Sequence, residues 1–251
     1  MENNFHHGHY EIVFYSINPY RRKEFPLKWK IDESNYLKNH KNNFNSVRHV
    51  RISSSDSLLS SNHHFPNATE LTLENISCNH SDSLINHLKQ SISLENVSKL
   101  NIMSMKYSFG KVIELLSLIP NINTLEISRI FIDLTQIDQI ENSESFQRVS
   151  KRTRIRNVII TRINQVEEIQ FLFNLCSQIQ ICQIHRCQNC TASIVRLLTA
   201  KNIDIAPNLV SLHIGTDDKS YLYRLDIVIR SGKLINDWNV NLQQNLIHLW
   251  K

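Results

Sequence analysis

Cysteine and histidine are the residues of this sequence most able to do chemistry. Cys187 and Cys190 have the spacing of a metal-binding cysteine pair, and Cys182 and His185 lie close by. A structural zinc site has four ligands, so it needs a second ligand pair. That pair is missing, because Cys176 and Cys182 fall at positions of a repeat in the chain that point into the core, and Cys187 aligns with the buried position after each predicted strand. We therefore expect these thiols to pack in the core without a metal.

The histidine and glycine patterns exclude the commonest enzyme signatures. His6-His7-x-His9 and His63-His64 lack metalloprotease spacing, and the sequence has neither a serine nucleophile elbow nor a cysteine–histidine nucleophile context. The four glycines lie far apart, whereas loops that cradle phosphate groups need clustered glycines. We expect a protein that is not an enzyme and that holds no cofactor.

Three arginines indicate binding rather than catalysis. Arg129, Arg162 and Arg186 each come two residues after an apolar-x-apolar segment. If these segments are neighbouring strands, the guanidinium groups form a column of like charges that an acidic group would stabilise. The column is either an anion-accepting rim for a carboxylate-rich or phosphorylated segment, or a set of solvated arginines paired with local Glu and Asp.

The basic run of residues 151–156 also has two interpretations. It would suit nuclear import or nucleic acid, but its Ile155 occupies a core position of the repeat. That position favours the solvated beginning of a strand.

A nine-residue repeat must position these side chains. In the three closest copies an apolar residue precedes Pro-Asn, a second apolar residue follows, and apolar-x-apolar closes the unit; the looser copies keep most of the apolar positions without Pro-Asn. Three close copies and four looser ones occur, at residues 65–73, 119–127 and 206–214, and at residues 44–52, 94–102, 152–160 and 176–184. Successive copies end 21 to 33 residues apart, mostly within the roughly 20–29 residues of a leucine-rich repeat.

Apolar-x-apolar segments with β-branched residues predict strands, and helical stripes lie between them. The stripes cover residues 112–119, 169–176, 194–198 and 222–229, and residues 81–83 offer a helix N-cap before Leu84. This alternation predicts an α/β fold, a leucine-rich-repeat-like curved solenoid of about seven irregular repeats. Its parallel sheet lies on the concave side and its helices on the convex side.

Strand positions that alternate with core residues face the concave side, where partners usually dock in such a fold. The sixth position holds His49, Glu70, Lys99, Thr124, Asn157, Ile181 and Ser211. The eighth position holds Arg51, Thr72, Asn101, Glu126, Ile159, Gln183 and His213. Ile159 and Ile181 should be neighbours, and exposed apolar neighbours can mark an interface. A covering loop would explain them equally. The predicted partner-binding residues are therefore Ile159, Ile181, Glu126, His213, Arg129, Arg162 and Arg186.

The ends of the chain differ from its middle. Residues 1–43 are rich in aromatic and basic side chains without the repeat, residues 44–237 carry the repeat, and residues 238–251 alternate like strands. Solenoids need atypical end units to cover their last apolar face, so we expect a cap at each end.

Composition is that of a soluble protein, 41% hydrophobic and 20% charged. No apolar stretch approaches the roughly 18 residues of a membrane span, and no signal peptide is visible. The five cysteines favour reduced thiols, and hence the cytoplasm or nucleus. The net charge of +5 is a mild bias, so we expect a protein partner and disfavour nucleic acid.

The Pro-Asn-x-x-x-Leu-x-Ile units resemble the repeat half of F-box/leucine-rich-repeat proteins, the substrate receptors of cullin-based ubiquitin ligases. Residues 113–116 (Ile-Glu-Leu-Leu), residues 146–151 (Phe-Gln-Arg-Val-Ser-Lys) and the Leu-Trp near the C-terminus are similar to a divergent invertebrate branch of that family. The resemblance covers about residues 44–251 and implies a protein–protein interaction module that recognises ligase substrates. Residues 1–43 lack the Leu-Pro-x-Glu motif of an F-box, so no ligase-binding residue carries over. The alternative function is binding of nucleic acid or of a phosphorylated or acidic ligand through the basic rim.

Overall fold

The computed structural model describes residues 24–27, 44–53, 64–74, 81–103, 108–130, 132–187, 190–199, 206–216, 239–243 and 246–250. In this part of the chain, ten strands form one sheet. The strands are β1 (Glu24–Leu27), β2 (His49–Ile52), β3 (Glu70–Glu74), β4 (Lys99–Met103), β5 (Thr124–Arg129), β6 (Asn157–Ile163), β7 (Ile181–Cys187), β8 (Ser211–Thr216), β9 (Asn239–Gln243) and β10 (Leu246–Trp250). The helices are α2 (Ser81–Ser91), α3 (Phe109–Leu116), α4 (Ile137–Glu141), α5 (Glu144–Arg152), α6 (Val166–Leu175) and α7 (Thr191–Thr199), with short 3-10 helices η3 (Leu94–Asn96) and η4 (Leu134–Gln136).

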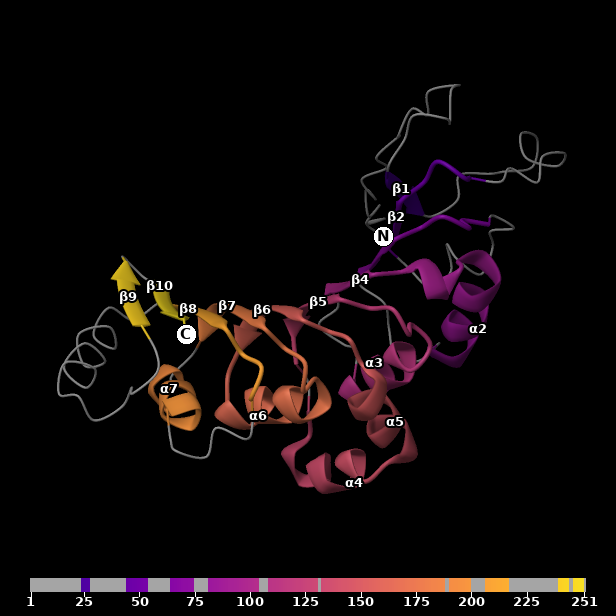
Figure 1. The fold of residues 1–251 in the computed structure, drawn as a ribbon. Helices are drawn as coiled ribbons and strands as arrows, with labels where there is room; N and C mark the ends of the chain where they lie inside the picture. The colour runs from indigo at the N-terminus through magenta and orange to yellow at the C-terminus, as the bar shows by residue number, and fades with distance from the viewer. Residues whose placement is uncertain are drawn as a thin grey trace, which may run out of the picture.

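Strand order in the sheet follows the order of the chain from β1 to β8, and each of these neighbouring pairs is parallel. β10 then pairs antiparallel with β8, and β9 pairs antiparallel with β10 at the edge. Parallel neighbours need crossover connections, and helices lie in several of these connections. Figure 1 shows the strands side by side along a curved sheet, with the labelled helices on its outer side. The expected α/β class and the mostly parallel sheet are confirmed.

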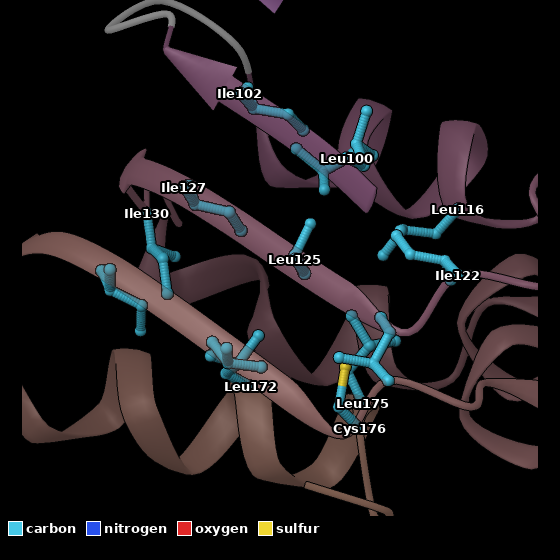
Figure 2. Packing of buried hydrophobic residues seen from close by; sticks show 14 of the residues in the cluster. Leu100, Ile102, Leu116, Ile122, Leu125, Ile127, Ile130, Leu172, Leu175 and Cys176 are labelled. Atoms are coloured by element: carbon cyan, nitrogen blue, oxygen red, sulfur yellow. The ribbon is translucent and has the colours of Figure 1, made fainter. Parts of the chain in front are cut away.

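The core lies between the sheet and the helices. Leu125 and Ile127 on β5 are at most 1% exposed, and they point to the same side as Leu100 and Ile102 on β4 (Figure 2). The expected stripes of α3 and α6 meet them, and Leu172 of α6 is fully buried. Burial of one such side chain contributes about 1.5–3 kcal/mol to stability. The buried side chains of each strand and of the helices packed on it therefore stabilise the stacking of each unit on the next.

An asparagine at the third position of the nine-residue repeat links successive units. Its Nδ2 donates a hydrogen bond to a backbone carbonyl oxygen of the preceding unit. These bonds join Asn67 to Asn45 (2.9 Å), Asn96 to Pro66 (2.8 Å), Asn121 to Glu95 (2.8 Å) and Asn208 to Ser177 (2.9 Å). We name this contact the asparagine clasp. In the units at residues 152–160 and 176–184, Arg154 and Gln178 take the place of the asparagine.

The unit between β5 and β6 is the longest, and η4, α4 and α5 fill it. The sequence analysis did not predict these helices. α5 begins where Ser143 Oγ accepts a hydrogen bond from the Phe146 N–H (3.2 Å), and it buries Phe146 and Val149. Only two of its residues are buried, so the pattern was too sparse to predict a helix.

Three further expectations concern the start of α2, the two ends of the chain and residues 222–229. α2 begins at Ser81 itself, so residues 81–83 belong to the helix rather than preceding it. β1 and the β9–β10 hairpin lie within the two end segments that lack the repeat. The helical stripe predicted at residues 222–229 lies outside the described residues.

Candidate functional site

The sheet face opposite the helices, named here the inner face, carries most of the predicted binding residues. Strand register aligns the sixth-position residues in one row and the eighth-position residues in a second. From β2 to β9 the second row reads Arg51, Thr72, Asn101, Glu126, Ile159, Gln183, His213, His248 and Asn241. The predicted rows therefore exist, and the antiparallel hairpin extends them.

The N-terminal half of the inner face pairs its charged side chains with one another. Lys99 Nζ lies 2.7 Å from Glu70 Oε1 and 3.7 Å from Glu126 Oε2, in an ion-pair network across three strands. The hydrogen bond to Glu70 is the main cause that raises the pKa of Lys99. Arg51 and Glu74 form another pair at 3.5 Å. Glu126 therefore belongs to an internal network, whatever its role toward a partner.

The next strands present uncharged side chains. Ile181 is 37% exposed, and Ile159 is half-buried on the strand beside it. Ile159 pairs with Gln183, two residues along β7 from Ile181, so the two isoleucines are diagonal neighbours on one face. The predicted apolar spot is present with this offset.

His213 and His248 form an imidazole cluster at the C-terminal end of the inner face. Their rings stack with centroids 4.0 Å apart, and Trp250 packs against His248 at 4.8 Å. The Ser211 hydroxyl lies 3.0 Å from His213 Nε2 and 3.2 Å from His248 Nε2. Burial lowers the pKa of His213, and the adjacent His248 lowers it further.

The imidazole cluster has one element of nucleophile–base chemistry, a hydroxyl beside an imidazole. In a working pair a third group orients the base. Here the hydroxyl is shared between two imidazoles, and the contacts of the described residues include no carboxylate bound to either ring. Among these residues no group of three His, Cys, Asp or Glu could hold a metal ion. The arrangement suits stacking and hydrogen bonding with a partner.

The three arginines lie inside strands, which corrects their expected position beyond the strand ends. Backbone pairing continues past the apolar-x-apolar segments, with Arg129 opposite Arg162 and Arg162 opposite Arg186. Ile163 and Cys187 are buried one residue later, and their burial keeps β6 and β7 extended to this point. The predicted arginine column exists in register.

Arg129 has local partners. With the Asn164 amide oriented so that its oxygen faces the guanidinium group, that oxygen accepts from Arg129 Nε at 3.1 Å. Burial raises the pKa of Glu168, and the Asn164 N–H and the charge of Arg129 oppose this shift. Arg162 and Arg186 form no such pair with the described residues.

The described cysteines are buried as expected, but two of them are not reduced. Cys187 and Cys190 are buried as predicted, but the structure joins them in a disulfide, which corrects the expectation of reduced thiols. Their spacing brings the two Cα atoms to 6.1 Å, within the usual range for a disulfide. Cys176 and Cys182 are buried free thiols, and burial raises the pKa of both, that of Cys182 to about 12.

The sequence analysis missed Ser211, His248 and Trp250 as site residues. The alternation of residues 246–250 suggested a strand, but nothing in it indicated an antiparallel pairing with β8. That pairing alone places His248 opposite His213 and Trp250 opposite Ser211.

Comparison with known proteins gives no relative. No protein-family model matches the chain, and no curated protein and no solved structure matches it. In the part of the chain that is described, no helix is long and apolar enough to cross a membrane.

Proposed function

We propose that this protein is a non-enzymatic protein–protein interaction module built as a leucine-rich-repeat-like curved solenoid. The observation that carries the proposal is the composition of the inner face. Its N-terminal half pairs its own charges, whereas its C-terminal half presents uncharged side chains around Ile159, Ile181 and the imidazole cluster. We name this C-terminal half the neutral patch.

The neutral patch has the chemistry of a protein-docking surface. Partly exposed isoleucines, stacked imidazoles and a tryptophan combine apolar area with a few hydrogen-bonding groups. Aromatic side chains are enriched at the centres of protein interfaces, where charged groups are depleted. Arg162 and Arg186 flank the neutral patch, so the partner would carry apolar residues with acidic residues beside them.

The resemblance to F-box/leucine-rich-repeat proteins supports a narrower form of the proposal. In that form the chain is the substrate-recognition part of an F-box-type ubiquitin ligase receptor, acting in the cytoplasm or nucleus. It needs no cofactor there, because recognition alone is its task.

Affinity capture with a matched pair of variants tests the proposal. We expect wild type to recover a defined protein from a lysate and the variant Ile159→Asp/Ile181→Asp to lose it. Binding of the partner would bury the two new carboxylates without a counter-charge, which is unfavourable. The control is Val210→Asp, which adds a carboxylate at a side chain 50% exposed and outside both inner-face rows. Equal recovery by both variants, or salt-sensitive RNA as the main product, would contradict the proposal.

A further inference from the structure

A basic hollow lies at the edge of the sheet where β5, β6 and β7 begin. Its volume is about 680 Å³, within the roughly 300–1,000 Å³ typical of ligand pockets. Lys151, Arg152, Arg154 and Arg156 contribute four cations to its lining, and the other lining residues are Pro120 and neutral polar side chains. This edge is opposite to the one where the arginine column lies, so the hollow is a separate site.

The four cations have no counter-charge within the described structure. The lining holds no Asp or Glu, and none of the four side chains forms a hydrogen bond or ion pair with a described residue. Two of the four cations have a structural explanation, because Lys151 and Arg152 lie in the last turn of α5 and interact favourably with the helix dipole. Arg154 and Arg156 follow the helix, so this explanation does not cover them.

The hollow coincides with the interruption of the asparagine clasp. Asn121 still donates to Glu95 O, but the next two units carry Arg154 and Gln178 at the clasp position. Neither of these side chains makes the equivalent hydrogen bond among the described residues. At the basic hollow, Arg154 and Gln178 thus replace the asparagine of the clasp.

We propose that the basic hollow binds a phosphorylated segment of a partner protein. A phosphate monoester carries a charge of about −1.5 to −2, so two such groups would balance the four cations. Arginine forms bidentate charge-assisted hydrogen bonds with phosphate, and the neutral hydroxyl and amide groups of the lining can donate to the remaining oxygens. Single-stranded nucleic acid fits less well, because its binding sites stack bases on aromatic side chains and the described lining has none.

The test is fluorescence anisotropy of the full chain with a labelled peptide that contains two adjacent phosphoserines. We expect this peptide to bind at least about tenfold more tightly than its unphosphorylated form, because only the phosphate groups can form charge-assisted hydrogen bonds with the arginines. Equal binding of the two peptides, no binding of either, or tighter binding of an oligothymidylate of matched charge would overturn the proposal.

Two variants and a control locate the site. Arg154→Asn supplies the clasp residue that other units carry, so it should fold as stably as wild type and yet bind the phosphopeptide several-fold more weakly. Arg154→Gln/Arg156→Gln should weaken binding about tenfold or more. Lys89→Gln/Arg196→Gln removes the same charge from exposed positions on α2 and α7 and should leave binding unchanged. Loss of binding in the control as large as in the Arg154→Gln/Arg156→Gln variant would also overturn the proposal.

Discussion

Arg129 and Arg186 occupy the same position of the repeat but differ in their surroundings. Arg129 is half-buried beside Asn164 and near the buried Glu168 carboxyl, whereas Arg186 is exposed at the end of β7. Arg129 therefore has an amide partner and lies near a carboxyl group. An anion-accepting role would fall to Arg162 and Arg186.

At the residue scale, the imidazole cluster predicts a pH dependence of stability. Burial and the neighbouring His248 lower the pKa of His213 in the folded protein, so the unfolded chain takes up this proton first as pH falls. The contribution of His213 is complete above the ordinary histidine pKa of about 6.5 and is lost as pH falls from there toward the folded value.

Denaturant unfolding at several pH values measures this effect. His213→Gln should lose less stability than wild type between pH 7 and pH 5, because it has no imidazole to protonate. A parallel fall in the two proteins would contradict the account, and His49→Gln is the control because His49 lies at the other end of the inner face.

At the element scale, β7 and β8 approach too closely for a side chain at Gly215. A Cβ atom there would lie 2.0 Å from the carbonyl oxygen of His185. Gly215→Ala should therefore destabilise the protein by about 1–3 kcal/mol, because the backbone of one strand has to move. Gly110→Ala is the matched control, since a Cβ there meets nothing within 4 Å in α3. Thermal unfolding should show that Gly110→Ala stabilises the protein by up to about 1 kcal/mol. An equal change in the free energy of unfolding in both variants would be inconsistent with the close strand contact.

Much of this arrangement could be predicted from sequence because it follows from local periodicity. The alternation of Leu125 and Ile127 and the stripes of α3, α6 and α7 each reflect burial of one face. Strand length could not be predicted in this way, since the paired Arg129, Arg162 and Arg186 are polar. The imidazole cluster depends on antiparallel pairing between distant segments, which no local pattern encodes.

At the scale of the whole molecule, the described sheet offers three chemically different regions. The basic hollow lies where β5 to β7 begin, the arginine column lies where they end, and the neutral patch lies on the inner face toward the C-terminal strands. A partner that spans them would combine phosphorylated, apolar and acidic segments. Its association should slow with rising salt, because charges at the two edges steer the encounter.

Hydroxyl-radical footprinting of the full chain, with and without the captured partner, tests the proposed docking face most directly. We predict that the partner reduces oxidation of Ile181, His213, His248 and Trp250, while exposed residues of α2 and α6 keep their labelling. Protection confined to the helices, with the neutral patch labelled as in the free protein, would contradict the assignment of the inner face as the binding surface.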